Sequence, residues 1–79
     1  MIHATGKAIK FIRDLNNREQ ADIAQSIGIH PSLLCHIEKG RRKCKPKYIE
    51  KFVEAIGITM EDFKEIEKRI TNEITGLAN

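Results

Sequence analysis

Residues 20–40, which read QADIAQSIGIHPSLLCHIEKG, determine how the rest of the chain is organised. Ile23, Ala24 and Ile27 fall at positions i, i+1 and i+4, the one-sided apolar pattern of a short amphipathic helix. Gly28 follows directly, and glycine tolerates the positive φ at which many helices end. The segment is therefore predicted to open with a short helix that stops at this glycine.

A second helix is predicted in the remainder of the segment. His30 occupies the N-cap position, and Pro31 suits the first helical position because a missing N–H costs nothing there. Leu34 and Ile37 are spaced i, i+3 and are predicted to face inward, and Gly40 suits the end of the helix. Two short helices joined by a tight turn form a helix-turn-helix pattern.

This stretch resembles the phage-repressor/Cro-type helix-turn-helix family, also called the xenobiotic-response-element family. The resemblance rests on the joint spacing of Gln20, Ile23-Ala24, Gly28, Ser32, Ile37-Glu38 and Gly40. It covers about residues 6–59 and implies that the helix at about 31–39 enters the DNA major groove. It also implies an ion pair between Arg13 and Glu38, near the end of that helix.

Base-reading residues follow from the same resemblance. The matching positions hold His30, Pro31, Ser32 and His36. Ser32 is able to donate to or accept from any base edge, His36 to donate to guanine, and Leu33 to contact a thymine methyl. Pro31 has no polar side chain, so one direct contact customary in the family is absent. The alternative for His36 is a solvated surface residue.

Phosphate contacts are predicted around the second helix of the motif. The run KGRRKCKPK at 39–47 places six cations in nine residues, and cations that flank a recognition helix bind phosphates and set its register. Gln20 matches a position where the family binds a phosphate or the flanking base, at a helix start whose dipole favours anions. The predicted set is Gln20, Lys39, Arg41, Arg42, Lys43 and Lys45. A nuclear-localisation signal is the alternative interpretation of the basic run.

The chain is predicted to be one all-α domain over residues 1–79, because 79 residues support a single small core. Five helices are expected, at about 5–15, 20–27, 31–39, 46–56 and from 60 onward. In the first of these, Ile9, Ile12 and Leu15 are predicted to face inward. The second departs from the family at its start, because Arg18 replaces a usual leucine and Glu19 replaces a usual Ser or Thr cap.

The charge is distributed unevenly along the chain. Residues 1–47 contain ten Lys or Arg against four Asp or Glu, whereas residues 48–79 contain four against seven. The two parts therefore carry net charges of +6 and −3. This difference suggests that the first part binds a polyanion and that the second has a different role.

The final helix, at 60–79, extends past the family-like core. Its apolar stripe is longer than the core of one small domain requires. The helix is therefore predicted either to pair with a second copy or to fold back on its own core. The first interpretation is preferred, and the predicted dimer interface consists of Phe63, Ile66, Ile70, Ile74 and Leu77.

These features predict a sequence-specific double-stranded-DNA-binding transcriptional regulator, a small homodimeric repressor that binds a palindromic operator. No nucleophile–base pair or phosphate-cradling glycine loop indicates an enzyme. The alternative function is a protein-interaction module, such as an antitoxin whose C-terminal helix binds a partner protein while DNA binding is secondary. No apolar run of membrane-spanning length and no signal peptide are seen, so a cytoplasmic location is expected.

No cofactor and no metal site are predicted. Cys35 and Cys44 stand nine residues apart with no second ligand cluster, which is a poor match to zinc-ligand spacing. The remaining alternative for these cysteines, with His30 and His36 nearby, is a metal- or thiol-switched sensor.

Overall fold

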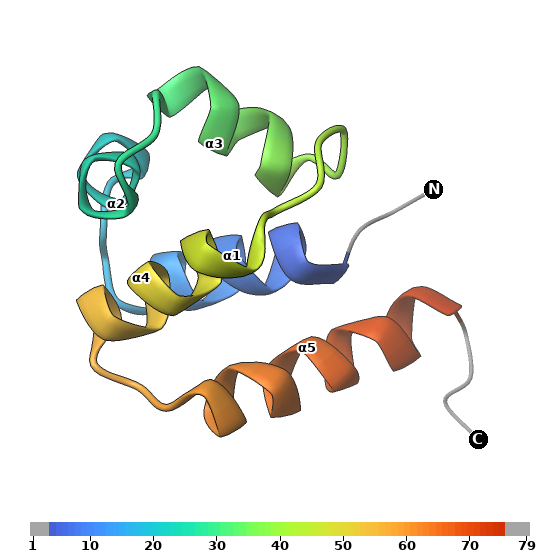
Figure 1. Ribbon diagram of the computed structural model, residues 1–79. Coiled ribbons are helices and arrows are strands. Elements are labelled where there is room, and N and C mark those ends of the chain that lie inside the picture. Colours follow the sequence, from blue (N-terminus) through green and yellow to red (C-terminus); the bar gives the residue numbers. More distant parts are fainter. Residues whose placement is uncertain (1–3, 76–79) are drawn as a thin grey trace.

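Five helices make up the part of the chain that the computed structural model describes, which is residues 4–75, with side chains described as far as residue 73. They are α1 (Ala4–Leu15), α2 (Gln20–Ile27), α3 (Pro31–Glu38), α4 (Pro46–Ile56) and α5 (Met60–Thr75). Residues 4–75 contain no strand, so the predicted all-α fold is confirmed. Figure 1 shows α2 and α3 together at one end, α1 and α4 across the middle, and α5 along the opposite side.

Local signals set most of the helix boundaries. Gly28 and Gly57 end α2 and α4 with φ of +86° and +90°, a backbone conformation that side chains with a Cβ rarely adopt. At the start of α5, the Asp62 N–H donates to Thr59 Oγ1 at 3.0 Å and the Thr59 N–H donates to Asp62 Oδ2 at 3.3 Å. This reciprocal capping fixes the start of the helix.

One aliphatic core joins all five helices. An edge-to-face pair of aromatic rings lies within it, Phe52 of α4 and Phe63 of α5, with ring centroids 6.1 Å apart. The buried apolar residues are Ala8, Ile9, Ile12, Ile23, Ala24, Ile27, Leu34, Ile37, Cys44, Phe52, Val53 and Phe63. The helix-turn-helix is thus held by the same core as the N- and C-terminal helices.

Helix α5 packs on its own chain, which removes Phe63 from the predicted dimer interface. Phe63 is only 1% exposed, and Ile66 and Ile70 are half-buried against the core. The Thr5 hydroxyl of α1 donates to the Glu67 carboxylate of α5, and α5 runs alongside α1 in Figure 1. The four preceding helices leave an apolar face open, and α5 covers it. The side chain of Ile74 and all of Leu77 lie outside the described residues.

The prediction that Leu15 faces inward is wrong, since it is 67% exposed. Each residue advances about 100° around a helix, so each i+3 step falls about 60° short of a full turn. Ile9 and Ile12 both remain on the buried side, but a third such position lies about 120° from the first. Leu15 instead shares an exposed face with Phe11, four residues earlier, which is 50% exposed.

Gly6 marks a backbone-to-backbone contact between α1 and α3 that the sequence does not reveal. A Cβ placed on Gly6 would lie 1.8 Å from the Ile37 carbonyl oxygen and 2.8 Å from its carbonyl carbon. Real Cβ atoms do not approach backbone atoms this closely, and neither main chain is able to move aside as a flexible side chain would. Glycine therefore allows α1 to cross the last turn of α3 at this point.

Gly6→Ala is expected to lower the free energy of unfolding by about 3 kcal/mol, because it overpacks a contact between two backbones. Denaturant unfolding followed by circular dichroism measures the change. Gln25→Ala, at an exposed position of α2, is the control and should leave stability nearly unchanged. A Gly6→Ala protein as stable as the wild type would show that the two helices do not approach each other this closely.

Candidate nucleic-acid interface

Helix α3 presents a polar face to solvent and an apolar face to the core. Leu34 is fully buried and Ile37 is 1% exposed, so these two side chains fix how α3 is turned. Four of the predicted base-reading residues are exposed, namely His30, Pro31, Ser32 and His36. Leu33 differs, because it is half-buried and packs against the core. The part of Leu33 that is left for a thymine methyl is correspondingly small.

His30 caps α3, as the sequence predicts. Its Nδ1 accepts the backbone N–H of Ser32 at 3.1 Å and lies 2.8 Å from Ser32 Oγ. A backbone N–H only donates, so Nδ1 must be the unprotonated nitrogen in this arrangement. The ring proton of the neutral imidazole is then on Nε2. The cap thereby determines which hydrogen-bonding group His30 has left for a ligand.

The same ring nitrogen also contacts the side-chain hydroxyl of Ser32. When the Ser32 hydroxyl donates its hydrogen to that nitrogen, it shares the Nδ1 lone pair with the backbone N–H, and the lone pairs of Oγ remain available. His30 therefore offers a donor at Nε2 while Ser32 offers an acceptor. The sequence predicts a cap at His30, but it does not reveal that the Ser32 hydroxyl contacts the same ring nitrogen.

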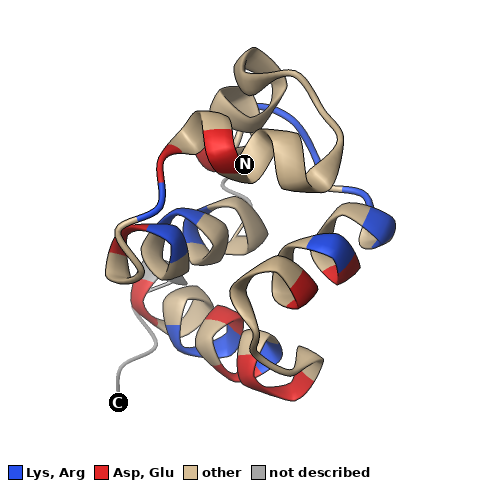
Figure 2. Cartoon of the chain, turned by 90° about the vertical axis from the view of Figure 1, so that its left-hand side faces the viewer, with Lys and Arg blue, Asp and Glu red and all other residues tan. Residues whose placement is uncertain are grey.

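A basic loop adjoins this face. Lys39 is the C-cap of α3, and the loop that follows continues to the start of α4. The predicted phosphate-binding cations are all exposed, namely Lys39, Arg41, Arg42, Lys43 and Lys45. Within residues 4–73 none of them forms an ion pair. Figure 2 shows Lys and Arg along this loop, whereas α4 and α5 carry charges of both signs.

A buried ion pair ties α1 to the end of α3, between the two residues that the family resemblance pairs. Arg13 Nε donates to Glu38 Oε2 at 2.8 Å, and a second guanidinium nitrogen donates to Glu38 Oε1 at 3.0 Å. The two side chains are 12% and 3% exposed. The hydrogen bond to Glu38 raises the pKa of Arg13 above its usual value. A third hydrogen bond, from Arg13 to the Arg18 carbonyl at 2.9 Å, connects the turn before α2 to this ion pair.

Gln20, predicted to contact a phosphate, joins the same network. Its Nε2 donates to Glu38 Oε1 at 2.9 Å, so one of its two amide hydrogens is used inside the protein. The second hydrogen is left for an anion. The preceding residue, Glu19, is an N-cap without a side-chain hydrogen bond, as its departure from the family pattern predicts. The first N–H groups of α2 therefore lack a side-chain acceptor from their cap.

The cysteines have different surroundings. Cys44 is 8% exposed, and burial raises the pKa of its thiol to about 11. Cys35 is half-buried on α3, and both thiols are free. No group of three or more metal-ligating side chains gathers anywhere in the described part of the chain. Among the described helices, none has the length and apolar character required to cross a membrane.

Comparison with known proteins identifies the fold family. A helix-turn-helix family model (HTH_3) matches residues 9–63, which is well over half of the chain. The chain belongs to the Cro/C1-type helix-turn-helix family. This family contains DNA-binding regulators of transcription, and the match includes α2, α3 and the basic loop of this member.

Individual relatives agree with this assignment. An uncharacterised helix-turn-helix-type transcriptional regulator of Archaeoglobus fulgidus is 38% identical over 52 residues, which cover 66% of this chain. The match spans only 23% of that larger relative. Two crystal structures of the clp gene regulator ClgR from Corynebacterium glutamicum share the fold. Their TM-scores are 0.77 and 0.83, with 20% and 17% identity, over 84% and 94% of this chain and 86% and 80% of theirs.

Proposed function

We propose that this protein is a sequence-specific double-stranded-DNA-binding repressor that reads its operator with the exposed face of α3. The observation that carries the proposal is the arrangement of α3 itself. Two buried side chains hold the helix against the core, while His30, Ser32 and His36 face outward beside an unpaired basic loop. Groups on such a face reach base edges, and the flanking cations bind phosphates and set the register of the helix.

The capping contact makes the base preference specific. His30, as a donor, matches an acceptor such as guanine N7 or O6 or adenine N7. Ser32, as an acceptor, matches an exocyclic amino group such as adenine N6 or cytosine N4. His36 is a separate polar contact one turn further along α3. We therefore expect an operator half-site in which a base with a major-groove acceptor lies close to a base with an exocyclic amino group.

Selection of bound sequences from random duplexes is the decisive experiment. The wild type should enrich one motif, and each direct contact is expected to be worth about 1–3 kcal/mol of discrimination. His30→Ser retains a capping oxygen but lacks the ring donor, so it should change the preferred base with little loss of stability. His36→Ala should relax a different position. Lys39→Ala is the matched control, because loss of a phosphate contact weakens all sequences alike.

Salt dependence tests the predicted phosphate contacts of the basic loop. Each phosphate that is neutralised releases about 0.9 counterions, so affinity should fall steeply as salt rises. Replacing Arg41, Arg42 and Lys43 by alanine should flatten that dependence. A protein that binds no DNA at low salt, or that enriches no motif from random duplexes, would not be a sequence-specific repressor.

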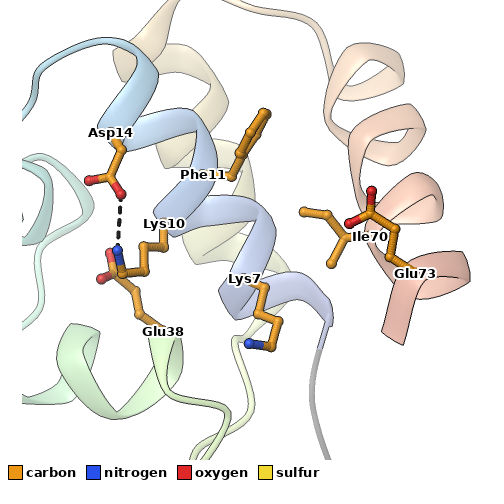
Figure 3. A pocket seen from close by; sticks show the side chains of 7 residues that line it. All are labelled: Lys7, Lys10, Phe11, Asp14, Glu38, Ile70 and Glu73. Atoms are coloured by element: carbon orange, nitrogen blue, oxygen red, sulfur yellow. Dashed lines mark hydrogen bonds and ion pairs between the residues drawn. The ribbon is translucent and has the colours of Figure 1, made fainter. Parts of the chain in front are cut away.

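We also propose that the protein acts as a homodimer, through a surface that joins an exposed face of α1 to part of the predicted α5 interface. Phe11 and Leu15 form an exposed apolar face of α1. Phe11 also borders a pocket of about 280 Å³ whose other lining residues belong to α5, namely Ile66, Arg69, Ile70 and Glu73. Figure 3 shows Phe11 and Ile70 on these two helices. Arg69 and Glu73 place one positive and one negative charge on this surface, which suits a self-complementary two-fold interface.

A further inference from the structure

A second pocket lies between the three N-terminal helices, next to the proposed dimer surface on α1. Its volume is about 310 Å³. The residues that line it are Lys7, Lys10 and Arg13 of α1, Gln20 of α2, and Cys35, Glu38 and Lys39 at the end of α3. The pocket therefore borders both the start of α2 and the exposed face of α3.

The charges around this pocket do not balance. Four cations line it against one carboxylate, and that carboxylate, Glu38, already accepts two hydrogen bonds from Arg13 and one from Gln20. Lys10 donates to Asp14 at 2.9 Å, but both side chains are more than half exposed, so water screens their attraction. Lys7 and Lys39 form no ion pair with any described residue. An anion in the pocket would relieve the repulsion among these cations.

The lining groups suit a phosphate. Lysine ammonium groups bind phosphate oxygens as point charges, and the second amide hydrogen of Gln20 is an additional donor. Gln20 is the first residue of α2, and this end of the helix has the positive end of the dipole and no side-chain cap. Figure 3 shows the Lys10 side chain beside Glu38, with Lys7 on the same helix.

We propose that this pocket binds one phosphate of the DNA backbone, so that α1 contributes Lys7 and Lys10 to the interface. The proposal rests on the proposed DNA-binding function, because it assumes that α3 faces the duplex. Cys35 and Lys39 line the pocket from α3, and His36 lies between them in sequence. A duplex placed on the face that carries His36 therefore brings its backbone to the mouth of the pocket.

The test uses operator duplexes in which one backbone phosphate at a time is replaced by an uncharged methylphosphonate. Binding is measured for the wild type, for the double variant Lys7→Ala/Lys10→Ala, and for the control Lys64→Ala/Lys68→Ala. The control lysines are exposed on α5 and remove the same charge. Thermal melting verifies that each variant is folded.

At one linkage, the methylphosphonate is expected to weaken binding by the wild type but not by Lys7→Ala/Lys10→Ala. That variant should also weaken all sequences alike and reduce the salt slope by about 1, while the α5 control retains both properties. Equal methylphosphonate penalties in wild type and variant at every linkage would overturn the proposal. An equal loss of salt slope in the α5 control would also overturn it.

Two further outcomes identify the source of a failure. A wild type that binds no duplex removes the proposed function and this inference together, whereas a wild type that selects a motif without coupling at any linkage removes the inference alone. Inorganic phosphate is titrated separately by NMR at low salt. Saturable binding near Lys7 without methylphosphonate coupling would mean that the pocket holds a free anion and does not bind the DNA backbone.

Discussion

Arg13→Ala is expected to lower the free energy of unfolding by about 3–5 kcal/mol, because it leaves the Glu38 carboxylate buried without its charged partner. Glu38 is 3% exposed and would retain only the bond from Gln20. Glu38→Ala should cost less. The guanidinium that it leaves behind is 12% exposed and still donates to the Arg18 carbonyl. Chemical denaturation of both single variants measures the two losses.

The double variant Arg13→Ala/Glu38→Ala should recover part of the loss, since no stranded charge remains. Lys10→Ala is the control, because it breaks an ion pair whose two partners are both more than half exposed, and such pairs contribute little. Strictly additive losses for Arg13 and Glu38 would mean that the two side chains do not interact. A cost for Lys10→Ala as large as that for Arg13→Ala would mean that burial does not determine the effect.

This ion pair also illustrates what a sequence reveals. The end of α2 and the start of α3 could be predicted, because glycine at positive φ and proline in the first turn both act locally. The contact of Arg13 with Glu38 followed only from the family resemblance. The bond from Gln20 to Glu38 could not be predicted, because it depends on how closely α2 approaches the end of α3.

The C-terminal helix shows where periodicity fails. An apolar stripe predicts that a helix is covered on one face, but it does not identify the covering partner. Phe63 meets Phe52 of the same chain, and its burial depends on the path of the chain around Gly57. Conversely, Phe11 and Leu15 are exposed although they belong to the helix that carries Ile9 and Ile12. The surface available for a second copy could therefore be located only from the packing of α1 with α5.

Replacing Phe11 and Leu15 by glutamate is expected to dissociate the proposed dimer while each protomer remains folded. Both side chains are already exposed in the single chain, so the change removes little from its core. Burial of an apolar side chain contributes about 1.5–3 kcal/mol, and a two-fold interface contains each residue twice. The dissociation constant is therefore expected to rise by about 10³-fold or more. Sedimentation equilibrium measures it directly.

Operator binding should follow the loss of the dimer. Two protomers related by a two-fold axis place their α3 helices on half-sites about 34 Å apart, one turn of B-DNA. Affinity for the full palindrome should then fall sharply in the Phe11→Glu/Leu15→Glu variant, while contacts to a single half-site are retained. Leu15→Ala alone, which adds no charge, is the milder comparison. A wild type that sediments as a monomer at tens of micromolar and selects a non-palindromic motif would place the functional unit in the single chain, because a two-fold dimer requires a two-fold site.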